Sequence, residues 1–368
     1  AALEQLGEKL EDKAVDWASR KGAKALMEAI ESRLAGPPGI YAWRGGELTP
    51  ADRCAEGSPQ LAAALAAGPA LLFIHGTGSH TLSGFGALPA SNAWQEIDQA
   101  FGGRIFGFEH RTFSESPINN ALHLLRALPD DACLHLVTHS RGGLVGDLLA
   151  LDPHDPQLDE LIDQYTRPPR PDEADAERHD PELKAERLKG EALEQAALRE
   201  LVGLMKQKRL RIERYVRVAC PARGTALLSD NLDLFLSGLL NGVRRFGAWG
   251  AGALVGSAAS PAAGATAKRI TNEALRFLTR VVLEIADKRI QPGVVPGIEA
   301  MLPEAPMGTL LGRATLAPTV RVALIAGDVE GDPNSFFHRV GVMFVDWALF
   351  DRARNDLVVD TDSMYGGL

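Results

Sequence analysis

One apolar run that ends in a serine and two glycines decides the fold of this chain: Leu134-His135-Leu136-Val137-Thr138-His139-Ser140-Arg141-Gly142-Gly143. This run predicts a buried strand that turns sharply at Ser140 and enters a helix with a glycine-rich first turn. Such a turn strains the serine backbone and projects its hydroxyl above the carboxyl edge of a sheet. Small residues are needed two positions before and two positions after the serine. Gly142 is the small residue two positions after the serine, whereas Thr138 stands where a small residue is expected two positions before it.

The sequence around this run alternates strand and helix patterns, which is typical of a parallel sheet covered by helices on both faces. The expected strands are Ala70–Ile74, Arg104–Phe108, Cys133–Val137, Tyr215–Ala219 and Val320–Ala326, and a short strand is expected at Ile40–Trp43. The expected helices include Ala93–Phe101, Ile118–Leu128 and Gly142–Leu151. We expect an N-terminal helical extension over residues 1–60 and one α/β domain over 61–368, with insertions at 153–208 and 227–296. Residues 153–187 are dense in charge and proline, which predicts a solvated, partly disordered excursion.

Composition narrows the class of protein. The 368 residues are 45% apolar and 24% charged, as in soluble globular proteins, and the net charge of −9 argues against a broad nucleic-acid surface. Three cysteines make no disulfide framework, so we expect a cytoplasmic protein in which Cys133 and Cys220 are buried. The uncharged stretch 246–267 is rich in glycine, alanine and serine and contains Pro261. It predicts a mobile lid rather than a membrane-spanning helix.

A second glycine-rich loop follows the strand expected at 70–74: Phe73-Ile74-His75-Gly76-Thr77-Gly78-Ser79-His80. In acyl transfer, backbone N–H groups beside the nucleophile hold the oxygen that becomes negative. We expect Thr77 to supply one such N–H and Arg141, directly after Ser140, to supply the other. No nucleotide-binding glycine motif is present, so a phosphate-binding loop is disfavoured. The structural alternative is that Ser140 only caps a helix.

Five pieces of the chain resemble the lipase and PGAP1-like branch of the α/β-hydrolase superfamily, over about residues 68–364. They are Ile74-His75-Gly76-Thr77, Thr138-His139-Ser140-Arg141-Gly142-Gly143, Cys220-Pro221-Ala222-Arg223-Gly224-Thr225, Ile325-Ala326-Gly327-Asp328 and Asn355-Asp356-Leu357-Val358-Val359. The resemblance implies an α/β-hydrolase fold with a helical lid, and a serine esterase that needs no cofactor.

The same resemblance implies that Asp356 is the acid of a catalytic triad, because it precedes a run of valines as in lipases. Asp328 directly follows the last expected strand and is a rival, as are Asp360 and Asp362 just downstream. Asp356 in a simple turn is a further alternative, since aspartate and asparagine favour turns.

The triad of this superfamily runs in the chain order Ser, Asp, His, but no histidine follows Asp356 here. Three explanations compete. The histidine could lie beyond Leu368 in a longer natural protein. His110, at the end of an expected strand, or His80, in the upstream loop, could serve instead, whereas His338 is better suited to packing or capping. Finally, the chain could be a hydrolase-like scaffold without catalysis.

The implied function is hydrolysis of a carboxylic ester through an acyl-enzyme on Ser140. The apolar segments Leu232–Leu240 and Phe246–Val255 of the expected lid favour an acyl or lipid substrate, and residues 232–267 could contact a membrane peripherally. The alternative function is an inactive scaffold or regulatory module of a larger multidomain protein, and a thioester or peptide substrate is a further rival. No metal motif is present. The aspartates at 130–131 and at 356, 360 and 362 could bind calcium but are more typical of solvated turns.

Overall fold

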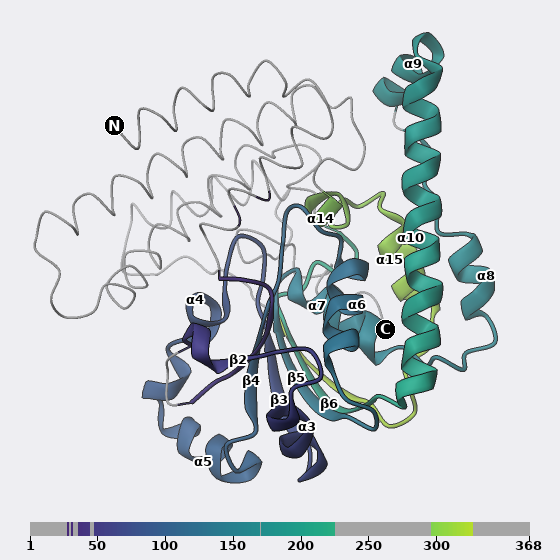
Figure 1. The fold of residues 1–368 in the computed structure, drawn as a ribbon. Coiled ribbons are helices and arrows are strands. Elements are labelled where there is room, and N and C mark those ends of the chain that lie inside the picture. Colours follow the sequence, from purple (N-terminus) through teal and green to yellow (C-terminus); the bar gives the residue numbers. More distant parts are fainter. Residues whose placement is uncertain are drawn as a thin grey trace, which may run out of the picture.

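One mixed sheet organises the part of the chain that the structure describes. The computed structural model describes residues 28, 31, 36–44, 48–169, 171–224 and 296–326. Within these ranges seven strands form the sheet in the order β2-β1-β4-β3-β5-β6-β7. The strands are β1 (Gly39–Ala42), β2 (Arg53–Cys54), β3 (Ala70–Ile74), β4 (Ile105–Glu109), β5 (Cys133–His139), β6 (Arg211–Val218) and β7 (Arg321–Ile325). Helices flank this sheet (Figure 1), so the predicted, mostly parallel α/β architecture is confirmed.

The order of the strands reverses at β3. This strand pairs in parallel with β4 on one side and with β5 on the other, and the parallel arrangement continues through β6 to β7. In open parallel sheets such a reversal leaves a crevice at the carboxyl ends of the strands, where ligands bind. In this chain the reversal lies between β3 and β5, which end at Ile74 and His139.

The short strand predicted at Ile40–Trp43 is present as β1 and forms part of one side of the sheet. Strand β1 pairs antiparallel with β4 and with β2. Ile40 and Tyr41 are buried in this arrangement. Strands β1 and β2, within the first 60 residues, therefore build one edge of the sheet.

Alternate residues of β3 enter two different cores. Leu72 and Ile74 belong to the larger core, and Phe73 belongs to the smaller one. In the smaller core the Trp43 ring meets Phe73 edge-on, with 5.0 Å between ring centroids, and lies 4.9 Å from the Trp94 ring. Burial on both faces is typical of a central parallel strand and explains why β3 reads as an unbroken apolar run.

Each core is covered by its own helices (Figure 1). The smaller core takes residues from α4 (Thr81–Phe85) and α5 (Asn92–Phe101). The larger core takes residues from α3 (Pro59–Ala66), α6 (Pro117–Ala127), α7 (Gly142–Ala150), α8 (Leu158–Asp163), α10 (Pro181–Lys208), α14 (Pro296–Glu299) and α15 (Pro306–Arg313). Two 3-10 helices span Pro50–Asp52 and Leu88–Ala90. The helices predicted at 93–101, 118–128 and 142–151 are thereby confirmed within one residue.

The insertion at 153–208 is more ordered than its composition predicted. It contains α8, α9 (Pro171–His179) and the long α10, whose outer end lies beside α9 (Figure 1). Leu161 of α8 is buried, and two arginines join the segments. Arg167 binds Glu173 at 2.5 and 2.7 Å, and Arg187 binds Glu177 at 2.6 Å. The expectation of a partly disordered excursion over 153–187 is therefore wrong, because α8, α9 and the start of α10 lie there and the two arginines bind carboxylates that are largely buried.

Three further expectations concern membranes, cysteines and the lid. Among the helices in the described ranges, none is both long enough and apolar enough to cross a bilayer. All three cysteines are free, and Cys133 and Cys220 are buried as predicted. The expected lid at 227–296 lies outside the described residues except for Pro296.

Candidate functional site

Ser140 occupies the sharp turn that the sequence predicts. Its φ of +53° is in the left-handed region, which costs a residue with a side chain about 1–2 kcal/mol. The Ser140 N–H donates to the Val218 carbonyl oxygen of β6 at 2.9 Å, and its own carbonyl oxygen accepts from the Gly143 N–H at 2.8 Å. The strained turn is thus held from both sides, with the half-buried serine between the end of β5 and the start of α7.

Two glycines allow the backbone to crowd around this serine. A Cβ atom on Gly76 would lie 2.8 Å from the Ser140 Cβ. A Cβ atom on Gly142 would lie 2.5 Å from the carbonyl oxygens of both Ile74 and His75. The loop after β3 and the first turn of α7 therefore meet at Ser140.

The structure also explains how Thr138 replaces the small residue expected two positions before the serine. Thr138 is fully buried, and its methyl group lies 2.9 Å from where a Gly146 Cβ would be. The Tyr215 hydroxyl lies 2.6 Å from the same point. Gly146, one turn into α7, thus supplies the room that a glycine at position 138 would otherwise provide.

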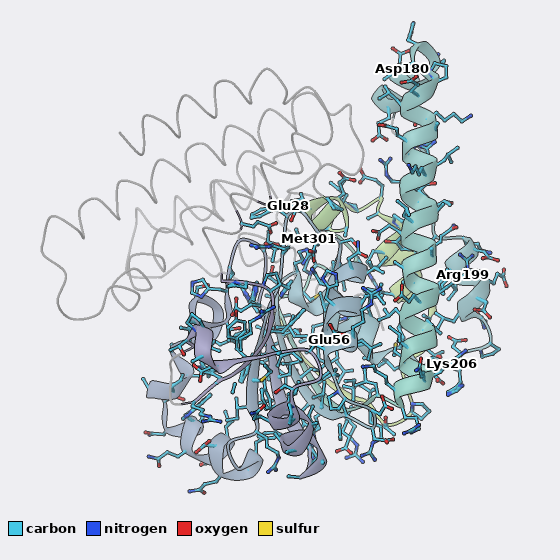
Figure 2. The ribbon with its side chains drawn as sticks, viewed as in Figure 1. Glu28, Glu56, Asp180, Arg199, Lys206 and Met301 are labelled. Carbon is cyan, nitrogen blue, oxygen red and sulfur yellow. The ribbon has the colours of Figure 1, made fainter. Side chains whose placement is uncertain are left out.

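The two expected oxyanion donors flank Ser140 in the chain segments that meet there. Thr77 directly follows Gly76, and Arg141 directly follows Ser140. Within the described residues neither backbone N–H donates to an acceptor of the protein. The side chain of Thr77 donates to the Met301 sulfur at 3.6 Å, just after α14 (Figure 2).

Arg141 also fixes the site through its side chain. The fully buried guanidinium donates to the carbonyl oxygens of Gly297 and Glu115 at 2.9 and 2.6 Å, and to Asn120 Oδ1 at 2.9 Å. Burial lowers the pKa of Arg141 to about 10, so the group stays charged at neutral pH. It thereby ties the elbow of Ser140 to α14, α6 and the loop before α6.

The two histidines proposed as bases lie in the neighbouring loops. His110 is buried and its ring stacks on His75 with 4.1 Å between centroids, while burial holds its pKa well below the usual range. His80 precedes α4, where its backbone N–H donates to Ser83 Oγ at 2.9 Å, and burial also lowers its pKa. Among the described residues no hydrogen bond joins either ring to Ser140.

His75 forms the centre of this polar cluster. Its Nδ1 lies 3.0 Å from the Gly76 carbonyl oxygen and its Nε2 accepts from the His110 backbone N–H at 3.3 Å, which places the proton on Nδ1. Glu109 Oε2 lies 3.5 Å from the same Nε2, and Glu109 Oε1 accepts from the Thr81 N–H at 2.9 Å. Burial raises the pKa of Glu109 and lowers that of His75 to about 4.

The neutral state of buried His75 predicts a loss of stability in acid. The unfolded chain takes up a proton at this histidine below about pH 6.5, whereas the folded chain resists protonation down to about pH 4. Unfolding therefore binds a proton in this window. As the pH falls from about 6.5 to about 4, the free energy of unfolding decreases by up to about 3 kcal/mol. In urea unfolding across this range, His75→Gln should lose that much less stability than the wild type. Equal pH dependence in both proteins would contradict the buried, neutral state.

A buried ion pair lies behind the elbow and was missed by the sequence analysis. Asp147 of α7 accepts from Arg217 Nη1 of β6 at 2.7 Å and from the Tyr215 hydroxyl at 2.8 Å. Burial raises the pKa of Asp147 to about 6, opposed by the charge of Arg217. The signal was present, because Asp147 is the one charged residue in the apolar helix predicted at 142–151.

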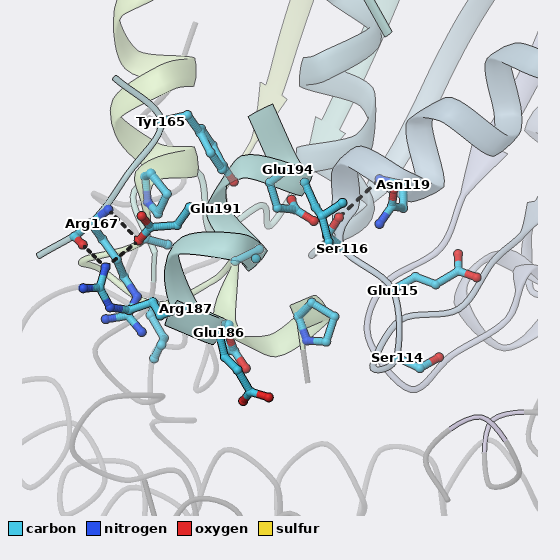
Figure 3. A pocket seen from close by; sticks show the side chains of 18 residues that line it. Ser114, Glu115, Ser116, Asn119, Tyr165, Arg167, Glu186, Arg187, Glu191 and Glu194 are labelled. Atoms are coloured by element: carbon cyan, nitrogen blue, oxygen red, sulfur yellow. Dashed lines mark hydrogen bonds and ion pairs between the residues drawn. The ribbon is translucent and has the colours of Figure 1, made fainter. Parts of the chain in front are cut away.

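A cavity of about 390 Å³ lies between α10, α14 and the loop before α6 (Figure 3). Its lining includes the acidic residues Glu115, Glu186, Glu191, Glu194 and Glu299. Burial raises the pKa of Glu194 to about 7. Ser140 does not line this cavity, whose wall also contains apolar residues such as Tyr165, Leu193 and Leu302.

Several predicted site residues lie outside the described part of the chain. They are Asp356 and its rivals Asp328, Asp360 and Asp362, together with His338. Within the described residues no group of three His, Cys, Asp or Glu side chains is arranged to bind a metal ion. Asp131 pairs with Arg209 through two contacts of 2.6 Å.

Comparison with known proteins gives a family but no activity. No curated protein and no solved structure matches the chain. One family model, described as a domain of unknown function (DUF7379), matches residues 42–162 and 193–367. The matched residues make up well over half of the chain and contain the elbow, the upstream loop and every strand except the first residues of β1. The chain therefore belongs to the family described as a domain of unknown function, DUF7379.

Proposed function

We propose that this protein is a serine hydrolase of the α/β-hydrolase fold, and that it cleaves a carboxylic ester through an acyl-enzyme on Ser140. The observation that carries the proposal is the left-handed backbone of Ser140 between β5 and α7. A strained serine at a strand-to-helix turn is the form that a nucleophile elbow takes. Strain of this kind persists where the surrounding structure enforces it, often at active sites.

The position of the serine in the sheet supports the same function. Ser140 follows β5 and Gly76 follows β3, the two strands at which the strand order reverses. The carboxyl ends of such strands are where open parallel sheets bind ligands. In the proposed reaction the Ser140 oxygen attacks the acyl carbonyl carbon, and the N–H groups of Thr77 and Arg141 stabilise the resulting oxyanion. The alcohol then leaves, and water attacks the acyl-enzyme to release the acid.

A histidine base and Asp356 would complete this chemistry. The base takes the proton of the Ser140 hydroxyl and passes it to the leaving alcohol, while the acid orients the base. The apolar segments 232–240 and 246–255 support an acyl or lipid ester as the substrate class.

Hydrolysis of p-nitrophenyl acetate, butyrate and palmitate tests this proposal on the full-length protein. Because the nucleophile is lost, Ser140→Ala should lower kcat/KM by about 10³-fold or more. Ser58→Ala is the matched control, since Ser58 only caps α3 and its loss should leave the rate unchanged. Turnover that survives Ser140→Ala would contradict the proposal.

An inactive scaffold is the second candidate function. The observation that favours it is the lack, within the described residues, of a hydrogen bond between the Ser140 hydroxyl and a histidine. Without a general base a serine hydroxyl is a poor nucleophile. A folded full-length protein that hydrolyses none of these esters or the corresponding thioesters would favour this candidate.

A further inference from the structure

The loop between β4 and α6 holds a buried carboxylate that comes from the N-terminal region of the chain. Glu31 Oε1 accepts from the backbone N–H groups of Thr112 and Phe113 at 2.5 and 2.7 Å. Glu31 Oε2 accepts from the Ser114 N–H at 3.1 Å and from the Ser114 hydroxyl. Three successive N–H groups that converge on one carboxylate form an anion-binding nest. Glu31 is only 4% exposed, so this anion is shielded from water.

The nest connects to the segment that carries Thr77. The Thr112 hydroxyl lies 3.5 Å from Glu31 Oε1 and accepts from the Gly78 N–H at 3.0 Å. Gly78 directly follows Thr77, whose N–H is one of the two proposed oxyanion donors. The Thr112 side chain thus connects Glu31 to the backbone next to this donor.

The nest also connects to Arg141. The Phe113 carbonyl oxygen accepts from the Gly297 N–H at 3.1 Å, and the Gly297 carbonyl oxygen accepts from Arg141 Nε at 2.9 Å. Burial lowers the pKa of Arg141, and among the nearby charges that raise it the negative charge of Glu31 has the largest effect. Both proposed oxyanion donors therefore depend on the segment that Glu31 holds.

We propose that Glu31 is a positioning residue, whose carboxylate fills an anion-binding nest at Thr112–Ser114 and so fixes the backbone of Thr77 and Arg141. The nest recognises a carboxylate, and the N-terminal region supplies it in cis. This proposal rests on the proposed function for its effect on catalysis, while the anion site itself stands on the hydrogen bonds alone. Glu31 is thereby a part of the proposed site.

The test replaces Glu31 and then returns a carboxylate in solution. In Glu31→Ala the second-order rate constant for labelling by a fluorophosphonate should fall about 10- to 100-fold, because the oxyanion donors lose their alignment. Sodium formate should restore much of the rate in a saturable way and should raise the Tm of this variant, whereas sodium chloride at equal ionic strength should do neither. Glu28→Ala removes an exposed acid three residues earlier in the chain (Figure 2) and should behave like the wild type.

The outcomes separate this inference from the proposed function. If Glu31→Ala does not fold, Glu31→Gln keeps one acceptor oxygen, and faster hydrogen exchange at the Thr112–Ser114 amides is the expected result. A Glu31→Ala protein that labels at the wild-type rate, or that formate neither rescues nor stabilises, would overturn the inference. If the wild type itself does not label, the proposed function fails. In that case the formate-dependent Tm of Glu31→Ala still decides whether the nest binds a carboxylate.

Discussion

Gly142→Ala should destabilise the protein by about 3 kcal/mol and abolish any activity of Ser140. The added methyl group would lie 2.5 Å from the carbonyl oxygens of Ile74 and His75. The two oxygens belong to the last residue of β3 and to the residue after it, so they cannot move without disturbing β3 and the loop that carries Thr77. Urea unfolding followed by circular dichroism measures the expected shift in the free energy of unfolding.

Gly203→Ala provides the matched control for this substitution. Gly203 also lies in a helix, α10, but a Cβ atom there would have no neighbour within 4 Å. Alanine should therefore stabilise the protein by up to about 1 kcal/mol through its higher helix propensity. If both variants had the same urea midpoint of unfolding as the wild type, α7 would not approach the loop after β3 as closely as the structure shows.

Asp147→Ala should cost about 3–5 kcal/mol of stability, because a buried guanidinium loses the carboxylate that faces it. Asp147 and Arg217 are 0% and 2% exposed, and their contact of 2.7 Å joins α7 to β6 behind the elbow. The measurement belongs near pH 8, where the carboxyl is ionised because its pKa is raised only to about 6. Ser140 depends on the same two elements, so the rate of fluorophosphonate labelling should fall as well.

Glu200→Ala breaks an ion pair of similar length on the surface. Its partner Arg126 lies 2.5 Å away, but both side chains are nearly half exposed. Such a pair contributes about 0–1 kcal/mol, so this variant should unfold close to the wild type. An equal loss of stability in the Asp147 and Glu200 variants would show that burial does not set the strength of the Asp147–Arg217 pair.

The elements nearest the elbow could be predicted because their signals are local. The strands that end at Ile74 and His139 are apolar runs, and α7 follows its glycines directly. The position of Ser140 followed from this pattern alone. Thr138 looked like a defect in the motif, because the compensating Gly146 and Tyr215 meet it only in the folded chain.

The rest of the site depends on contacts between distant parts of the chain. Glu31 lies 81 residues from Thr112, with which it forms a hydrogen bond. Nothing in the charged N-terminal pattern distinguishes Glu31 from the other acids around it. The order of residues 153–187 was missed for the same reason, since their charges read as solvated until Arg167 and Arg187 find their carboxylate partners.

The nucleophilic role of Ser140 is the central claim, and covalent labelling tests it most directly. The full-length protein is treated with a fluorophosphonate, and the modified peptide is identified by mass spectrometry beside Ser140→Ala and Ser58→Ala. We predict one adduct on Ser140 that is absent from Ser140→Ala and unchanged in Ser58→Ala. A folded protein that forms no adduct, or an adduct that persists in Ser140→Ala, would contradict this role.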